Sequence, residues 1–242
     1  MSQHKIMQKK HSISIVIPAH NEIGCIEQVV TSSLEFLKSH LVFDPFEIII
    51  VDDGSRDETP FILKKLKQNN MNVITVITHK SNLGYGLAMT SGIKQAKYSL
   101  ILLMDADGQF KIDSINNIIN FIPEYDIIAG FRQKRMDPFP RIILGKTYSK
   151  IASLFFGVKI QDINCGFKLF KKEALAINKI ECHSGVFYTS ILIGAISKGF
   201  KLKQYPIKHY PRIAGKQSGA SLKVIFASAI DILRLKYIMM SS

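Results

Sequence analysis

The chain has 242 residues, of which 47% are hydrophobic and 21% charged, so it is a globular protein with a sizeable core and not a disordered segment. Its 32 Lys and Arg residues against 19 Asp and Glu residues give a formal charge of +13, which favours phosphorylated substrates or anionic lipid headgroups as partners. The cations are spread along the chain without a nucleic-acid-binding signature, which argues against nucleic acid; a basic surface that only aids solubility is the alternative.

The first half of the chain alternates short apolar runs with segments of helical period. The predicted strands are Ser12–Ile17, Phe46–Val51, Asn72–Ile77 and Tyr98–Met104, and the predicted helices between them are Glu22–His40, Thr59–Asn69 and Gly84–Ala96. This alternation is typical of βαβ units. We therefore expect an α/β fold with a Rossmann-like, mostly parallel sheet flanked by helices.

The second half is less regular. A helix is predicted at Ile112–Phe121, strands at Asp126–Ala129, Phe167–Phe170 and Lys201–Ile207, a helix around Phe187–Lys198, and a basic stretch from Arg132 to Lys150 that leads into apolar Ile151–Phe156. We expect a single domain: a flexible N-terminus (1–11), a nucleotide-binding half (12–130), an acceptor-side half (131–220) and a C-terminal amphipathic helix (221–242).

Cysteine usage and hydropathy bear on location. The three cysteines (Cys25, Cys165 and Cys182) lack metal-type spacing and suit a reducing compartment. Ile13–Pro18 is too short for a secretory signal, and no apolar run reaches the length of a membrane span. Val224–Met240 comes closest, but charges interrupt it; it suits an interfacial or oligomer-forming helix, or packing on the core. These features predict a cytoplasmic protein at the membrane surface.

Polar clusters follow the four predicted strands of the first half. They are Pro18-Ala19-His20-Asn21-Glu22, Asp52-Asp53-Gly54-Ser55, Ser81-Asn82-Leu83-Gly84-Tyr85-Gly86 and Asp105-Ala106-Asp107. Ligands of open parallel sheets bind beyond the carboxyl ends of the strands, where these clusters are expected. Acidic turns after strands are common, but four clusters in series indicate a binding site.

Asp105 and Asp107 are the most specific feature. Two carboxylates two residues apart, directly after a central strand, are hard oxygen ligands for Mg²⁺ or Mn²⁺, and Gln109 is a candidate third ligand. Such a cation neutralises a diphosphate and stabilises it as a leaving group. The alternative is that one aspartate only caps a helix after Phe110.

Cationic side chains are candidates for the remaining electrostatic work. Arg132, Arg135, Arg212 and Lys216 are suited to stabilising a departing phosphate, although each alone also reads as a surface charge. Gly215 and Gly219 flank Lys216, so a mobile basic loop is expected to close over the site as a lid.

Taken together, the motifs resemble those of the family 2 glycosyltransferases of GT-A fold, in the branch that acts on polyprenyl and dolichyl phosphates with mannose or glucose. The matching stretches are Ile15–Glu22, Val51–Thr59, Asn82–Gly86, Met104–Gln109 and Asp162–Phe170, with the loop Pro211–Lys216. They run in the family's order from about residue 12 to residue 220. They are specific for the family and less so for the sugar.

The resemblance implies roles for individual residues. Those that bind the donor would be Pro18, Ala19, His20, Glu22, Asp53, Gly84, Asp105, Ala106 and Lys216. Asp105, Asp107 and Gln109 would hold the metal, and the residues closest to the chemistry would be Asp105, Asp107, Arg132 and Arg212. Arg132 would face an anionic acceptor, while Arg212 and Lys216 would close over the phosphates. Asp162 and Gly166 fall in the stretch that shapes the acceptor side.

Two departures from the family's pattern matter. Many relatives carry an acidic residue in the helix corresponding to Phe187–Ala195, and this chain has none there. A phosphate acceptor is already ionised at pH 7, whereas a sugar hydroxyl gains about 10²–10⁴-fold from a general base, so the gap favours a lipid phosphate. Relatives also continue into membrane spans while this chain stops at Ser242, so peripheral membrane contact is expected.

The resulting hypothesis is a metal-dependent, inverting transfer of a hexose from UDP- or GDP-sugar to polyprenyl phosphate, with homo-oligomerisation left open. One alternative is transfer to a glycan hydroxyl in cell-surface polysaccharide synthesis. Another is a non-catalytic nucleotide-sugar-binding or membrane-surface protein that keeps the fold. Nucleotidyl transfer on a related sheet is disfavoured, because Pro18–Glu22 lacks the Gly-rich, Arg-containing loop that it requires.

Overall fold

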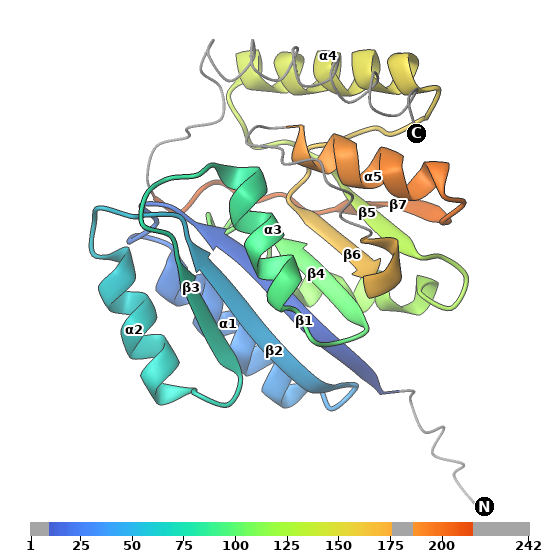
Figure 1. Ribbon diagram of the computed structural model, residues 1–242. Coiled ribbons are helices and arrows are strands. Elements are labelled where there is room, and N and C mark those ends of the chain that lie inside the picture. The colour runs from blue at the N-terminus through green and yellow to red at the C-terminus, as the bar shows by residue number, and fades with distance from the viewer. Residues whose placement is uncertain (1–9, 176–185, 215–242) are drawn as a thin grey trace, which may run out of the picture.

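The computed structural model describes residues 10–175 and 186–214, which form one seven-stranded sheet covered by helices on both faces (Figure 1). The strands are β1 (His11–Ala19), β2 (Phe43–Asp52), β3 (Ile74–Thr78), β4 (Leu100–Met104), β5 (Ile127–Arg132), β6 (Phe167–Lys171) and β7 (Leu202–Ile207). The helices are α1 (Ile26–Ser39), α2 (Thr59–Asn69), α3 (Tyr85–Gln95), α4 (Phe139–Phe156) and α5 (Phe187–Ser197), with 3₁₀ segments η1 (Ile112–Asn117), η2 (Ile119–Phe121) and η3 (Lys172–Ala174).

The sheet has the order β3-β2-β1-β4-β6-β5-β7, and every neighbouring pair is parallel except those of β6, which runs antiparallel to both β4 and β5. The predicted mostly parallel α/β fold is therefore confirmed. The first four strands end at the same edge, and β6 enters from that edge beside β4. This reversal brings the chain around Gly166 against the end of β4.

Strand β1 shows how the pattern of apolar residues produces the layers. Ile15 and Ile17 face the core that α1 and α2 cover, whereas Val16 between them faces the core that α3, α4 and α5 cover. Successive side chains of a strand point to opposite faces of a sheet, so a strand that is buried on both faces is apolar throughout. β4 follows the same rule, with all five residues buried.

The structure corrects three predicted elements. α1 begins at Ile26 and not at Glu22, because the backbone of Asn21 takes φ +56° and residues 20–25 form a turn. The predicted helix Ile112–Phe121 consists of two 3₁₀ segments. The basic stretch from Arg132 to Lys150, for which no helix was predicted, contains most of the 18-residue helix α4. Its apolar and basic residues are mixed along the sequence, so no single apolar face predicts the helix.

Some predictions fall outside the described residues, namely the N-terminus up to residue 9, Cys182, Lys216 with Gly215 and Gly219, and the C-terminal helix. Cys25 and Cys165 are buried, and neither forms a disulfide within the described residues. Within residues 10–175 and 186–214, no helix combines the length and hydropathy needed to cross a bilayer.

Close packing of α3 on the sheet gives a stability prediction at Gly92. A Cβ at this position would lie 2.4 Å from Val16 Cγ1 and 3.1 Å from Val51 Cγ2. Gly92→Ala is expected to destabilise the fold by about 1–3 kcal/mol through overpacking, partly offset by about 1 kcal/mol of helix propensity. Urea unfolding measures this difference. Gly194→Ala in α5, where no described atom lies within 4 Å of an added Cβ, is the control and should be neutral or slightly stabilising.

Candidate active site

The polar residues after β1 and β2 first of all bind the two loops to each other. Asn21 donates its backbone N–H to Ser55 Oγ at 2.9 Å and accepts the N–H of Arg56 on its Oδ1 at 2.8 Å. Glu22 donates its backbone N–H to Thr59 Oγ1 at 3.0 Å. These bonds hold both loops at the carboxyl edge of the sheet, where the polar clusters were predicted to meet.

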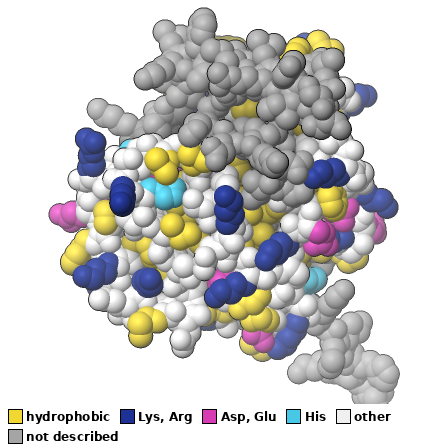
Figure 2. All heavy atoms as spheres, viewed as in Figure 1, with side chains coloured by type: hydrophobic (Ala, Val, Ile, Leu, Met, Phe, Trp, Pro, Cys, Tyr) yellow, Lys and Arg dark blue, Asp and Glu magenta, His cyan; other side chains and the backbone are white. Residues whose placement is uncertain are grey.

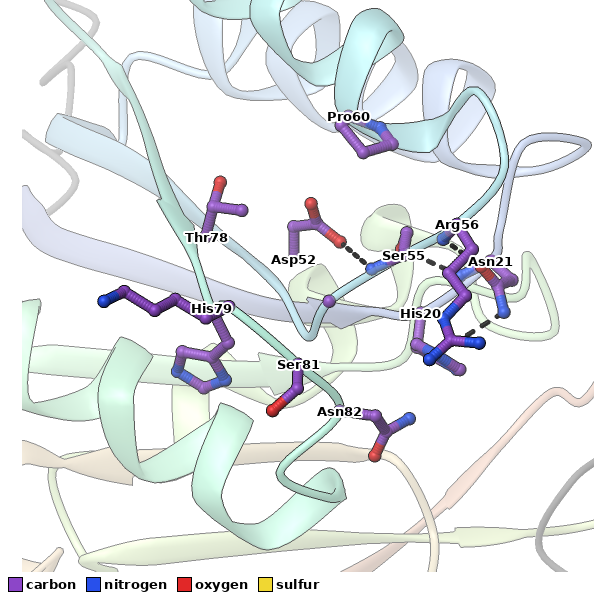
Figure 3. A pocket seen from close by; sticks show the side chains of 12 residues that line it. His20, Asn21, Asp52, Ser55, Arg56, Pro60, Thr78, His79, Ser81 and Asn82 are labelled. Carbon is purple, nitrogen blue, oxygen red and sulfur yellow. Dashed lines mark hydrogen bonds between the residues drawn. The ribbon is translucent and has the colours of Figure 1, made fainter.

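An open pocket of about 480 Å³ lies at this edge. Figure 3 shows the side chains that line it, which come from the ends of β1, β2 and β3 and the start of α2: His20, Asn21, Asp52, Gly54, Ser55, Arg56, Pro60, Thr78, His79, Lys80, Ser81 and Asn82. The pocket has the size of a small-molecule site, and two of its side chains, Arg56 and Lys80, are cationic.

The two aspartates after β2 have different surroundings. Asp52 lines the pocket; its Oδ1 accepts the N–H of Ser55 at 3.0 Å, while its buried Oδ2 has no hydrogen-bond partner. Asp53 accepts three bonds, from the backbone N–H groups of Leu83 and Gly84 and from His79 Nδ1, at 2.7–2.9 Å. Asp53, for which the resemblance implied a role in holding the nucleoside, thus binds the loop before α3, whereas Asp52 of the same predicted cluster lines the pocket.

Asp105 lies half-buried directly after β4. Its Oδ1 accepts the hydroxyl of Tyr85 at 2.7 Å, and the hydroxyl oxygens of Tyr85 and Tyr188 lie 2.8 Å apart. Its backbone N–H donates to Gly166 O at 3.1 Å, so the chain after β4 runs beside the chain before β6. Burial raises the pKa of Asp105. The sequence assigned no role to either tyrosine, although Tyr85 stands inside one of the quoted motifs.

The pKa of Asp107 is raised by burial and by the charge of Asp105, and lowered by the charge of Arg212. The net effect is a rise of this pKa from 3.8 to about 6. Its Oδ1 accepts the N–H of Gln109 at 3.0 Å, and its Oδ2 lies 3.3 Å from Nη1 of Arg212. The same guanidinium donates from Nη2 to both carboxylate oxygens of Glu22, at 2.6 and 2.7 Å. The fold therefore brings together three predicted site residues from distant parts of the chain.

The segment that carries Arg212 packs closely on the loops below it. An added Cβ at Gly24 would lie 2.4 Å from Ala214 Cβ, and one at Gly108 would lie 2.3 Å from Ile213 Cδ1. Gln109 Nε2 also donates to the carbonyl of Tyr210 at 3.3 Å. The described part of the predicted lid thus lies against the acidic residues.

The acidic pair fits a hard divalent cation. Asp105 and Asp107 offer oxygen ligands only, and burial raises the pKa of both carboxyl groups, so a bound cation would favour their charged forms. Among the residues that the structure describes, no group of three or more His, Cys, Asp or Glu side chains is placed to hold a metal. A cation would therefore need further oxygen atoms from Gln109, water or a ligand. The metal site remains a prediction.

A cluster of arginines lies near Asp105, where the charges of Arg132 and Arg141 act on its pKa. Arg132 donates to both oxygens of Asp162 at 2.6 and 2.7 Å, and Asp137 lies within 3.4 Å of the guanidinium groups of Arg132, Arg135 and Arg141. Among residues 10–175 and 186–214, three guanidinium groups thus share the carboxylates of Asp137 and Asp162. Burial lowers the pKa of Arg141, and the charges of Arg132 and Arg135 lower it further.

We refer to these five side chains as the arginine cluster; its two predicted members, Arg132 and Arg135, are already paired with aspartates. Arg141 was missed because no helix was predicted there. His209 packs beside the cluster: its Nδ1 accepts the N–H of Met136 at 3.0 Å, and burial, together with the charge of Arg132, lowers its pKa to about 4. His209 is therefore neutral at pH 7.

The seven-stranded, mostly parallel sheet with its flanking helices is a fold of GT-A type. Solved structures agree on the fold: the glucosyl-3-phosphoglycerate synthase of Mycobacterium tuberculosis, in complex with Mn²⁺, uridine diphosphate and glucosyl-3-phosphoglycerate, matches with a TM-score of 0.70 over 93% of this chain and 78% of that chain, at 15% identity. The family model "Glycosyl transferase family 2" matches residues 14–177. The chain belongs to this family and is a glycosyltransferase.

Curated relatives come from the branch that the motifs indicated. The chain is 27% identical over 254 residues to the dolichyl-phosphate beta-glucosyltransferase of Saccharomyces cerevisiae, covering 94% of this chain and 75% of that protein. It is 26% identical to the polyprenol monophosphomannose synthase of Mycolicibacterium smegmatis, covering 86% and 82%. Glycosyltransferase AglD of Haloferax volcanii is 29% identical over 83% of this chain, which spans 33% of that protein's length.

Proposed function

We propose that the chain transfers a hexose from UDP- or GDP-sugar to a polyprenyl phosphate, by direct displacement with inversion at the anomeric carbon. The observation that carries the proposal is the arginine cluster, because among the described residues it gathers three guanidinium groups, with Asp137 and Asp162, near the acidic pair. The names of the relatives from Saccharomyces cerevisiae and Mycolicibacterium smegmatis support the same acceptor class.

The pocket at the ends of β1, β2 and β3 is the proposed site of the donor's nucleoside. His20 offers a ring for stacking, and Arg56 and Lys80 favour a nucleotide's negative charge. Asp52 has a free carboxylate oxygen to accept an N–H of the base. Pro18, Ala19 and Gly84 would shape this binding site through the backbone.

The donor diphosphate would lie over Asp105, Ala106 and Asp107. Mg²⁺ or Mn²⁺, held by Asp105 and Asp107 with Gln109, supplies positive charge to the departing diphosphate when bound. Arg212 is the protein's own cation at this position, already placed by Asp107 and by both oxygens of Glu22. Because its guanidinium is already held in place before the reaction, no reorganisation of the protein is needed as negative charge develops on the diphosphate.

The acceptor phosphate would bind at the arginine cluster. Planar guanidinium groups match phosphate geometry, and exchanging a carboxylate partner for a phosphate would keep each charge paired. α5 offers no acid for general-base catalysis: its residue Tyr188 bonds Tyr85, and Thr189 Oγ1 lies 2.7 Å from the hydroxyl of Tyr148. A phosphate acceptor needs no such base, because it is ionised at pH 7.

An assay with two kinds of acceptor tests the proposal. The purified chain is incubated with Mn²⁺, radiolabelled UDP- or GDP-hexoses, and a short polyprenyl phosphate, the matching polyprenol or an oligosaccharide. We expect label in the lipid phosphate at a rate about 10²-fold or more above the polyprenol, which lacks the ionised nucleophile. Transfer to the oligosaccharide with none to the lipid phosphate would replace the proposal by the polysaccharide alternative.

A further inference from the structure

The outer side of α4 exposes an unusual number of large apolar side chains. Phe139 is 73% exposed, Ile143 49%, Ile151 54% and Leu154 86%. Ser149 and Ala152 of the same helix are buried, so α4 has an inner and an outer side along its length of about 27 Å. Figure 2 shows hydrophobic side chains at the upper edge of the molecule, where Figure 1 places α4.

The charges of α4 have one sign. The helix contains Arg141, Lys146 and Lys150 and no acidic residue, and Lys146 and Lys150 are exposed among the apolar residues. Single exposed apolar residues are ordinary, but several on one side of a helix with lysines among them are typical of helices that lie in a membrane interface. We call Phe139, Ile143, Lys146, Lys150, Ile151 and Leu154 the α4 outer face.

The inner side of the same helix belongs to the arginine cluster. Arg141 lies 3.3 Å from Asp137, and an added Cβ at Gly145 would lie 2.4 Å from Nη1 of Arg135. A phosphate bound at this cluster is therefore separated from the α4 outer face by one helix. A polyprenyl chain attached to that phosphate has to reach a bilayer, so the bilayer must lie beside α4.

We propose that the α4 outer face binds the surface of a membrane that contains anionic lipid. Phe139 and Leu154 enter the headgroup region, while Lys146 and Lys150 contact lipid phosphates. The inference rests on the proposed lipid-phosphate acceptor for its orientation, and on the exposed residues of α4 for the contact itself. The chain's formal charge of +13 favours the same partner.

Vesicle co-sedimentation of the full chain tests the contact. The chain is mixed with vesicles of phosphatidylcholine alone or with added phosphatidylglycerol. We expect binding to the anionic vesicles that falls about tenfold or more in Phe139→Ser/Leu154→Ser, because two apolar side chains lose their burial. Phe61→Ser is the matched control: Phe61 is 69% exposed on α2, away from α4, and its loss should leave binding unchanged. Lys146→Gln/Lys150→Gln should reduce the salt dependence.

Activity on two acceptors separates the failure of this inference from the failure of the proposed function. Phe139→Ser/Leu154→Ser should lose turnover of a long polyprenyl phosphate in vesicles and keep turnover of a short, water-soluble polyprenyl phosphate. A wild-type chain that transfers sugar to neither polyprenyl phosphate would refute the proposed function. Its binding to vesicles would still test the membrane contact of the α4 outer face. Equal vesicle binding by wild type and double variant would overturn the inference. The inference would also be overturned if neither protein bound vesicles and the wild type formed a dimer that was lost in Phe139→Ser/Leu154→Ser.

Discussion

Asp107→Asn is expected to reduce sugar transfer by about 10²–10³-fold while the chain remains folded. The amide keeps the shape of the side chain but removes the charge that would bind a divalent cation, and with it the compensation for the donor's diphosphate. Initial rates with saturating donor and Mn²⁺ measure the effect. Asp113→Asn is the control, since Asp113 is exposed on η1. A variant with wild-type rates would end the proposal of a metal site.

Asp107→Asn is expected to lower activity but to raise the free energy of unfolding, and the second effect can be measured without an activity assay. The pKa of Asp107 is about 6 in the folded chain against an ordinary 3.8. Between these values the folded chain binds more protons than the unfolded chain, so this group destabilises the fold progressively as pH rises from about 4 to 6. The full cost at pH 7 is about 3 kcal/mol at most, and the pKa of about 6 from which it follows already includes the opposing charge of Arg212.

Unfolding free energies in the presence of a chelator test this sign. Asp107→Asn should be more stable than the wild type at pH 7, and the two curves should converge below about pH 4. Mn²⁺ should then stabilise the wild type more than the variant, because only binding to the folded state raises its stability. Parallel curves from pH 4 to pH 7 would show that Asp107 is not under electrostatic strain.

Gly166→Ala is expected to abolish most activity at a modest cost in stability. A Cβ at Gly166 would lie 1.8 Å from Oδ2 of Asp105 and 2.1 Å from its Cγ, so the carboxylate cannot keep its position. The carboxylate is the end of a side chain and can rotate away, which limits the expected destabilisation to about 1–3 kcal/mol. The rate should fall by about 10²-fold, since misplacing a reacting group by about 1 Å has effects of that size.

Two measurements distinguish this mechanism from a general loss of structure. Thermal unfolding of Gly166→Ala should remain cooperative, with a melting temperature within about 10 °C of the wild type for a chain of this size. The stabilisation by Mn²⁺ with a nucleoside diphosphate should be lost together with activity. Gly194→Ala, which meets no described atom, provides the matched control. Normal Mn²⁺-dependent stabilisation and normal rates in Gly166→Ala would contradict a role for the carboxylate of Asp105.

Local sequence patterns were sufficient for much of the fold. The predicted strands overlap all seven observed strands. In β1, β2 and β4 the signal is a continuous apolar run, which is typical of strands that are buried on both faces. α4 was not predicted because its exposed and buried apolar residues share the same helix, so no amphipathic period separates core from surface. The exposed apolar residues that obscured the helix are those that now form the α4 outer face.

Three features could be determined from the sequence by itself. They are the family, the mostly parallel sheet, and the aspartates that follow β4. These depend on residues close together in the chain, where backbone preferences and apolar periodicity are local. Only the tertiary structure decided the partners. The reversal of β6 places Gly166 beside Asp105, and the return of the chain after β7 carries Arg212 to Glu22 and Asp107. Such contacts join residues tens to hundreds of positions apart, and the strand order together with the path of the chain between and after the strands determines which of them meet.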